Sequence, residues 1–235
     1  MLATLRPAAE RGHFDHGWLD TYHTFSFADY VDPKWMGFRS LRVINDDIIA
    51  PRGAFGMHPH RDMEIISYIV SGAIRHTDSL GHERVLRAGG FQAITAGSGI
   101  LHGEANGSES EPMRLIQIWI RPDARGLKPG YAEIEPVADL ARNEWRIVAG
   151  PVGRAPQGAL AIHQDAWLRH AHLSRGATLS HEIAPTRAAW LQVVDGSVRV
   201  GERVLSRGDG LAVESAGPLA IIGVEEADLL LFDLA

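Results

Sequence analysis

The stretch GSGILHGEAN, residues 97–106, places a glycine-rich turn directly before a predicted strand that carries His102 and Glu104 two positions apart. The same spacing occurs earlier in the chain, in His58-Pro59-His60. Side chains alternate between the two faces of a β-strand, so residues i and i+2 project to the same side. Two such strands facing one interior would supply three imidazoles and a carboxylate. The sequence therefore predicts a mononuclear metal site.

Three histidines with one carboxylate suit a borderline or fairly hard divalent ion, namely Fe(II), Mn, Co, Ni, Cu(II) or Zn. A six-coordinate ion held by four protein ligands keeps two positions open, which indicates chemistry at the metal rather than a purely structural site. Spacing leaves two candidates for the carboxylate, Glu64 and Glu104. On an unbroken strand Glu64 would share a face with His58 and His60. The carboxylate that is not a ligand would orient an imidazole or relay a proton.

Short runs of β-branched and aromatic residues, separated by glycine-rich turns, predict an all-β barrel or sandwich. Pro59 lacks an N–H group, so its strand is expected to begin there or to lie at a sheet edge. A single short helical turn is expected at residues 138–142. Residues 121–139 interrupt the strand rhythm and are expected to connect two halves. The strand-forming runs are residues 65–70, 113–120, 190–194, 198–200 and 229–232.

The two halves contain a faint repeat. Residues 69–74, IVSGAI, are echoed by residues 193–198, VVDGSV, and residues 87–91, RAGGF, by residues 207–211, RGDGL. A strand, a glycine turn, a strand and a second glycine turn thus follow in the same order in each half. The second half lacks the paired ligands at the equivalent places. This pattern predicts two barrels, of which one binds metal and one is degenerate.

Composition places the chain among soluble globular proteins, because 45% of its 235 residues are hydrophobic and 22% are charged. The net charge of -6, without a run of Lys or Arg, argues against a nucleic-acid partner. The absence of cysteine excludes disulfides and thiolate metal sites. The N-terminus has no secretory signal pattern, and no run approaches the roughly 18 apolar residues of a membrane span. We therefore expect a cytoplasmic protein without a membrane partner, and a monomer.

The remaining histidines give weaker signals. His76 and His82 flank Asp78 in a predicted hairpin loop and are interpreted as surface residues or as neighbours of the metal ligands. His170-Ala171-His172 repeats the i, i+2 spacing, but no partner motif with a carboxylate follows a glycine turn there, so a second metal site is not expected. The histidines near the N-terminus lie among aromatic residues and are interpreted as structural hydrogen-bonding groups; they are His13, His16 and His23.

Two segments resemble the motifs of the cupin family. Residues 53–72 resemble the first motif, with a glycine, His-x-His, a glutamate and a second glycine. Residues 90–106 resemble the second motif, although Ala96 stands where proline is common. More specifically, the chain resembles bacterial pirin-like proteins of the group named quercetin 2,3-dioxygenases. The residues that carry this resemblance are 16–18 (HGW), 24–27 (TFSF), 37–38 (GF), 41–47 (LRVINDD), 58–64 (HPHRDME), 95–104 (TAGSGILHGE), 117–119 (QIW), 190–194 (WLQVV) and 230–234 (LLFDL).

The resemblance implies an all-β bicupin of two jelly-roll barrels with short helices only. Residues 1–135 would form the N-terminal metal-binding barrel and residues 136–235 the degenerate C-terminal barrel. It further implies one metal ion, usually iron, bound by His58, His60, His102 and Glu104. Glu104 is thereby preferred over Glu64 by analogy, and Glu64 becomes a candidate for a supporting catalytic role.

The first functional hypothesis is a metal-dependent dioxygenase that opens the ring of a flavonol such as quercetin with O2. The 3-hydroxyl group of the substrate would lose its proton to Glu104, or to Glu64 through water, and ring cleavage would give a depside and carbon monoxide. A flat aromatic substrate would lie in the barrel mouth near Phe55, Met57 and Ile66. The alternatives are a metal- or redox-sensing regulatory protein of pirin type, and a metal-dependent enzyme acting on another small enolic substrate.

Overall fold

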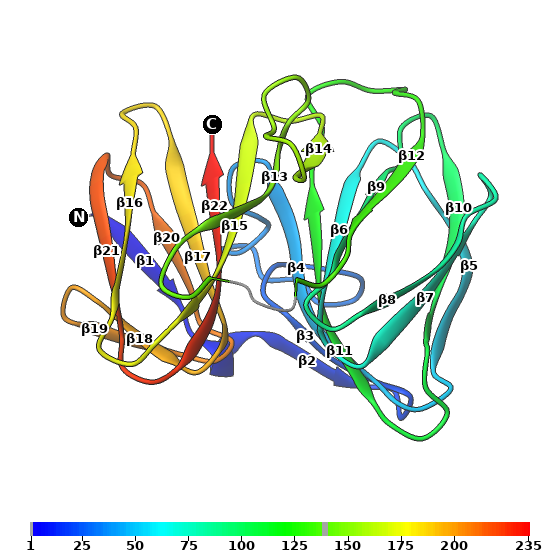
Figure 1. Cartoon of the computed structure of the whole chain (residues 1–235), viewed down its shortest axis with the longest axis horizontal. Helices are drawn as coiled ribbons and strands as arrows, with labels where there is room; N and C mark the ends of the chain where they lie inside the picture. The colour runs from blue at the N-terminus through cyan, green and yellow to red at the C-terminus, as the bar shows by residue number, and fades with distance from the viewer. Residues whose placement is uncertain (1, 138–140) are drawn as a thin grey trace.

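The computed structural model describes residues 2–137 and 141–235 and confirms the predicted all-β fold. Two units, each built from two β-sheets, lie side by side (Figure 1). The first unit contains β2 (Gly12–Asp15), β3 (Leu19–His23), β4 (Leu41–Ile49), β5 (Ala54–His60), β6 (Glu64–Ser71), β7 (Ala73–Asp78), β8 (Glu83–Arg87), β9 (Phe91–Thr95), β10 (Ile100–Asn106), β11 (Met113–Ile120) and β12 (Gly130–Ile134). The second unit contains β13 (Arg146–Pro151), β14 (Leu160–Ile162), β15 (Ala166–Leu173), β16 (Thr178–Ile183), β17 (Ala188–Asp195), β18 (Ser197–Val200), β19 (Arg203–Ser206), β20 (Gly210–Val213), β21 (Gly217–Gly223) and β22 (Ala227–Leu234).

Each unit pairs a seven-stranded sheet with a four-stranded sheet. In the first unit the strand orders are β12-β9-β6-β11-β4-β3-β2 and β5-β10-β7-β8. In the second unit they are β1-β20-β17-β22-β15-β13-β14 and β16-β21-β18-β19. The strand succession β6-β7-β8-β9 of the first unit corresponds to β17-β18-β19-β20 of the second. These are the segments in which the sequence repeat occurs, so the repeat reflects two copies of one topology.

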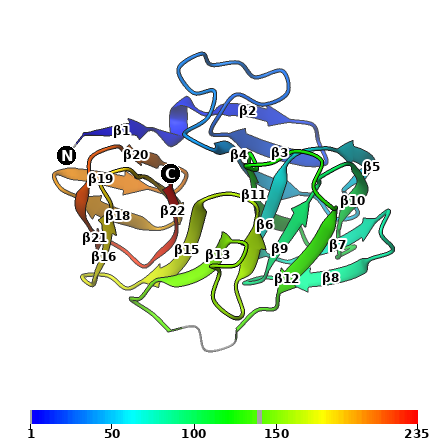
Figure 2. The ribbon, with the colours of Figure 1, turned by 90° about the horizontal axis from the view of Figure 1, so that it is seen from above.

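The first strand crosses between the units. Strand β1 (Ala3–Arg6) pairs with β20, with Ala3 opposite Val213 and Arg6 opposite Gly210 (Figure 2). The predicted division assigned residues 1–135 to the first barrel. In the structure, residues 3–6 instead belong to a sheet of the second unit. Strand β1 and its partner β20 lie at opposite ends of the chain. A local sequence pattern cannot show such a pairing, because it depends on the tertiary structure.

Helical structure is minimal. The described residues contain one short 3-10 helix, η1 (Ala8–Glu10). Of the helical turn predicted at residues 138–142, residues 138–140 lie outside the described residues. Among residues 2–137 and 141–235, no helix has the length and apolar character needed to cross a membrane.

The two seven-stranded sheets pack against each other through an apolar core that both units share. Ile66 and Ile118 contribute to it from the first unit, and Leu168 and Phe232 from the second. Burying each such side chain stabilises the packed arrangement by about 1.5–3 kcal/mol. Because side chains alternate along β6, its even-numbered residues face the second unit and its odd-numbered residues face the interior of the first barrel. This orientation determines which residues can reach the candidate site.

Candidate metal centre

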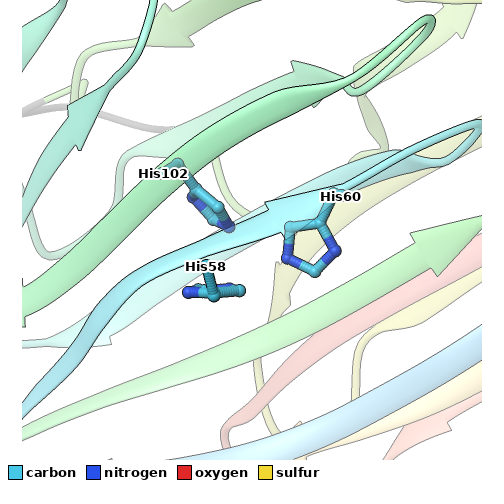
Figure 3. Close-up of side chains that lie close together, drawn as sticks. All are labelled: His58, His60 and His102. Carbon is cyan, nitrogen blue, oxygen red and sulfur yellow. The ribbon is translucent and has the colours of Figure 1, made fainter.

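Strands β5 and β10 bring three histidines together. The two strands pair antiparallel, with His102 directly opposite His58 and with Ile100 opposite His60. The side chains of His58, His60 and His102 lie close together (Figure 3), and a ring nitrogen from each lies within 4.8 Å of the others. The i, i+2 spacing in β5 and the cross-strand register together therefore place three imidazoles in one cluster.

Local sequence features set up both strands. Strand β5 is at the edge of its four-stranded sheet, as expected for a strand that contains Pro59. The turn before β10 needs glycine at position 97, because a Cβ there would lie 2.1 Å from the Leu127 carbonyl oxygen and the φ angle is +48°. Gly97 also accepts a hydrogen bond from the Asp62 amide, which links this turn to the end of β5. The glycine-rich turn thus positions His102 opposite His58.

The surroundings of the cluster leave its nitrogens available for a metal. Both ring nitrogens of His102 are buried and have no hydrogen-bond partner among the described residues. His58 Nδ1 lies 2.8 Å from the Gly56 carbonyl oxygen, so it carries the proton and Nε2 is free to act as a ligand. Burial lowers the pKa of His60 to about 4 and that of His102 to about 3. Neutral imidazoles with free lone pairs are the form that binds metal, so these residues fit one divalent ion.

Glu104 lies beside His102 on the same face of β10, beyond a register shift between the two residues. Its carboxylate accepts hydrogen bonds from Gln92 Nε2 at 2.6 Å and from Gln117 Nε2 at 3.0 Å. Burial raises its pKa to about 7. A carboxylate oxygen of Glu104 groups with nitrogens of His76 and His102 within 4.8 Å, whereas the three-histidine cluster forms without it. Its role as fourth ligand stays a prediction.

Glu64 lies on the opposite face of the large sheet. Its carboxylate accepts a hydrogen bond from the Thr95 hydroxyl at 2.9 Å and contacts His163 Nδ1, in the second unit, at 3.3 Å. The unbroken strand that would place it on one face with His58 and His60 does not form. The chain leaves β5 at His60, turns through Asp62 with φ of +49°, and enters a different sheet at Glu64. The rule that alternate residues share a face holds only within one continuous strand.

His76 differs from its prediction as a loop residue. It lies within β7, is fully buried, and its ring centroid is 5.7 Å from that of His102. Asp78 Oδ2 lies 3.0 Å from His76 Nε2 and 2.9 Å from His82 Nδ1. Asp78 therefore anchors both histidines, and only His82 is on the turn between β7 and β8. His76 therefore lies next to the three-histidine cluster, which agrees with its interpretation as a neighbour of the metal ligands.

A cavity of about 540 Å³ opens onto the three histidines. This is a size typical of small-molecule sites, which occupy roughly 300–1,000 Å³. Of the predicted lining residues, Phe55 borders the cavity; Met57 points outward with 55% of its surface exposed, and Ile66 lies in the core shared with the second unit. Aromatic side chains dominate one part of the wall; they are Trp18, Phe27, Phe55 and Trp119.

Polar residues that the sequence reasoning missed form another part of the wall. Asn45 and Asp47 line the cavity from β4, and Thr21 and His23 line it from β3. A signal was present in the sequence, because Asn45 and Asp47 are two polar residues at alternate positions of β4, a strand that also contains five apolar residues of the Leu, Ile and Val type. Burial raises the pKa of Asp47 to about 7, and the neighbouring Asp46 and Glu104 carboxylates add to the rise.

A second histidine group lies at the junction of the units. His170 and His172 of β15 come within ligand distance of Asp228 of β22, which supplies a carboxylate that the sequence motif lacked. The Asp228 carboxylate is already engaged, because His170 Nε2 lies 2.8 Å from it and the Tyr68 hydroxyl donates to it at 2.7 Å. This network joins the first unit to the second.

These features define a two-barrel protein with a histidine-based candidate metal centre in its first barrel. The Pirin family model matches residues 4–120, and the model of the quercetinase C-terminal cupin domain matches residues 147–234. The chain is 44% identical over 230 residues to a protein of Escherichia coli (strain K12) named quercetin 2,3-dioxygenase, with 98% of this chain and 97% of the relative covered. It is 39% identical over 231 residues to a pirin-like protein of Caulobacter vibrioides, with 98% of each chain covered.

Solved structures agree with the sequence relatives. The bacterial pirin YhhW from Escherichia coli in complex with nickel(II) superposes with a TM-score of 0.93 at 43% identity, covering 99% of each chain. A quercetin 2,3-dioxygenase from Acinetobacter baumannii superposes with a TM-score of 0.79 at 20% identity, covering 99% of this chain and 85% of that one, and shows the fold alone. The chain belongs to the pirin family, which confirms the resemblance in its motifs.

Proposed function

We propose that this protein is a metal-dependent dioxygenase that opens the ring of a flavonol of the quercetin type with O2 and releases carbon monoxide. The observation that carries this proposal is the cluster of His58, His60 and His102 at an aromatic-lined cavity large enough for such a substrate. Two Escherichia coli relatives that match along nearly the whole chain are named quercetin 2,3-dioxygenase, which supports the reaction class.

His58, His60 and His102 would hold the metal ion, for which Fe(II) is our proposal, and Glu104 would be the fourth ligand. When bound, a divalent ion of this kind supplies Lewis-acid and redox chemistry at the end of the cavity. The reaction consumes one flavonol and one O2 and gives one depside and one carbon monoxide, so no further oxidant or reductant is required.

Glu104 is the group best placed to accept the proton of the substrate's 3-hydroxyl. Gln92 and Gln117 hold its two carboxylate oxygens in place beside His102. A carboxylate fixed in this position could take up the proton of a substrate hydroxyl bound at the metal and return it to the product. The aromatic side chains of Trp18, Phe27 and Phe55 would flank the flat ring system and exclude water.

The test is anaerobic reconstitution of the metal-free protein with Fe(II), and with Mn, Co, Ni, Cu or Zn in separate samples, followed by measurement of oxygen uptake and carbon monoxide with quercetin. We expect uptake that requires metal and disappears in His60→Ala. His13→Ala is the matched control, since His13 is exposed and pairs with Asp20 outside the cavity. Absence of uptake with every correctly loaded metal would refute the dioxygenase and favour a sensor or another enolic substrate.

A further inference from the structure

The wall of the cavity that belongs to the seven-stranded sheet carries a polar row. His23 on β3 is opposite Asn45 on β4, and Asn45 is opposite Gln117 on β11. Beyond the three residues that line the cavity, the row continues through the buried Ser67 on β6 to Gln92 on β9. Cross-strand neighbours on one face of a sheet lie about 4.5–5.5 Å apart, so neighbouring side chains of this row can contact one another.

The two ends of the row differ in how their hydrogen bonds are satisfied. At one end, Gln117 and Gln92 donate to Glu104. At the other end, Asn45 Oδ1 and His23 Nδ1 are buried and have no partner among residues 2–137 and 141–235. Leaving a buried polar atom unpaired costs roughly 1–3 kcal/mol, so this end is built to meet a polar group that comes from outside the chain.

Asp47 supplies a third polar group at the unsatisfied end. It is two residues from Asn45 on the same face of β4, lines the cavity, and is 4% exposed. Thr21 donates to its Oδ1, and Oδ2 has no hydrogen-bond partner in the described part of the chain. The neighbouring Asp46 projects to the other face, where Arg114 binds it at 2.7 Å. The Asp47 carboxyl is thus held by one hydroxyl, with its second oxygen available to a ligand.

We propose that Asn45, Asp47 and His23 form a subsite that binds phenolic hydroxyls of the substrate at a distance from the metal. One hydroxyl would donate to the free carboxylate oxygen of Asp47 and accept from His23 Nδ1–H, and a neighbouring hydroxyl would donate to Asn45 Oδ1. The inference rests on the proposed function, and it narrows the substrate class to flavonols that carry hydroxyl groups on their outer rings. A site built to hydrogen-bond a hydroxyl discriminates strongly against an analogue that lacks it.

Ligand binding to protein loaded with Zn, in the absence of oxygen, tests the subsite without turnover. The two probes are quercetin and 3-hydroxyflavone, which share the 3-hydroxyl but differ in the outer-ring hydroxyls. We expect wild-type protein to bind quercetin more tightly, and Asp47→Leu to raise the quercetin Kd about tenfold or more while changing the 3-hydroxyflavone Kd less than about twofold. Asn45→Leu should act in the same direction.

Asp20→Asn is the matched control, because it removes a carboxylate from the outward face of β3 and should leave both Kd values unchanged. If Asp47→Leu does not fold, the near-isosteric Asp47→Asn takes its place, with a smaller loss confined to quercetin. Equal effects on both probes, or no effect on quercetin, would overturn the subsite even where oxygen uptake confirms the dioxygenase. Conversely, Asp47-dependent quercetin binding without oxygen uptake would support the subsite and refute the dioxygenase.

Discussion

His102 is the most buried of the three clustered imidazoles, and no hydrogen bond from the described residues restrains its ring nitrogens. We expect such a side chain to gain its polar contacts when a metal binds. Glu104, in contrast, has both carboxylate oxygens engaged by amides. The ring of His102 therefore depends on a metal for its polar contacts, whereas the amides hold the Glu104 carboxylate in place before any metal binds.

The first prediction concerns metal binding by His102. We expect His102→Ala to weaken metal affinity by more than about 100-fold, because loss of a ligand should exceed the effect of losing a supporting group. The thermal unfolding midpoint of the metal-free protein should change little, since the ring makes no hydrogen bond. Metal content after dialysis and a thermal melt measure both effects. His82→Ala, on the turn after β7, serves as the control, and unfolding of His102→Ala would show that the cluster is structural.

The second prediction concerns the two glutamates. Because Glu64 contacts Thr95 and His163 rather than the cavity, we expect Glu64→Gln to retain metal and turnover within about twofold while lowering unfolding stability by about 1–2 kcal/mol. Glu104→Gln should instead reduce turnover strongly. Metal analysis, oxygen uptake and urea denaturation of both variants test these expected effects on metal content, turnover and stability. A selective loss of turnover in Glu64→Gln would restore its predicted catalytic role.

The third prediction follows from Asp47. Its pKa is about 7 in the folded state and 3.8 in the unfolded state, so between these values the folded protein holds a proton that the unfolded chain has lost. Its contribution to stability therefore falls as pH rises from about 4 to about 7. Relative to wild type, Asp47→Asn should be more stable at pH 8 than at pH 5 by roughly 2–4 kcal/mol. Urea denaturation at both pH values tests this, and a pH-independent difference would contradict it.

At the scale of elements, the turn before β10 controls the position of the metal cluster. The spacing of apolar and glycine residues was sufficient to predict strands at His58 and His102, because strand alternation and glycine turns are local properties. The same spacing was insufficient to predict the positions of Glu64 and His76. The chain leaves one sheet at His60 and enters another at Glu64, and β7 continues beyond His76 to Asp78, so both differences concern where a strand ends.

The fourth prediction tests this turn. Gly97→Ala should destabilise the protein by at least about 2 kcal/mol and reduce metal affinity, because its Cβ would collide with the Leu127 carbonyl oxygen and its φ is positive. Gly81→Ala is the matched control, since Gly81 also has a positive φ but no atom within 4 Å of the added Cβ. It should cost about 1 kcal/mol and leave metal binding unchanged. Equal metal loss in both variants would contradict a positioning role for the turn.

At the scale of the whole molecule, the second barrel covers the outer face of the sheet that lines the cavity. Tyr68 donates to Asp228 across this boundary, and Arg114 donates to the Val194 carbonyl oxygen at 2.8 Å. Tyr68 is itself a member of the shared apolar core. The second barrel therefore supports the cavity wall from behind.

The fifth prediction is that residues 1–137 expressed alone will not form a stable monomer. The fragment would expose the apolar face that carries Ile66, Phe91 and Ile118, and β1 would lose its partner β20. Size-exclusion chromatography, dye binding to exposed apolar surface and metal content measure the outcome, with the full chain as control. A monomeric, metal-binding fragment would show that the first barrel is independent.

The sequence by itself determined the β-rich class, the repeat of two barrels and the pairing of His58 with His60, because each depends on alternation or turn chemistry within a few residues. Only the tertiary structure decided that Glu64 faces the second unit, that β1 belongs to the second sheet, and that Asn45 and Asp47 face the same cavity as the histidines. Those facts depend on which sheet a strand joins and which of its faces is covered, and both are set by contacts between residues far apart in the chain.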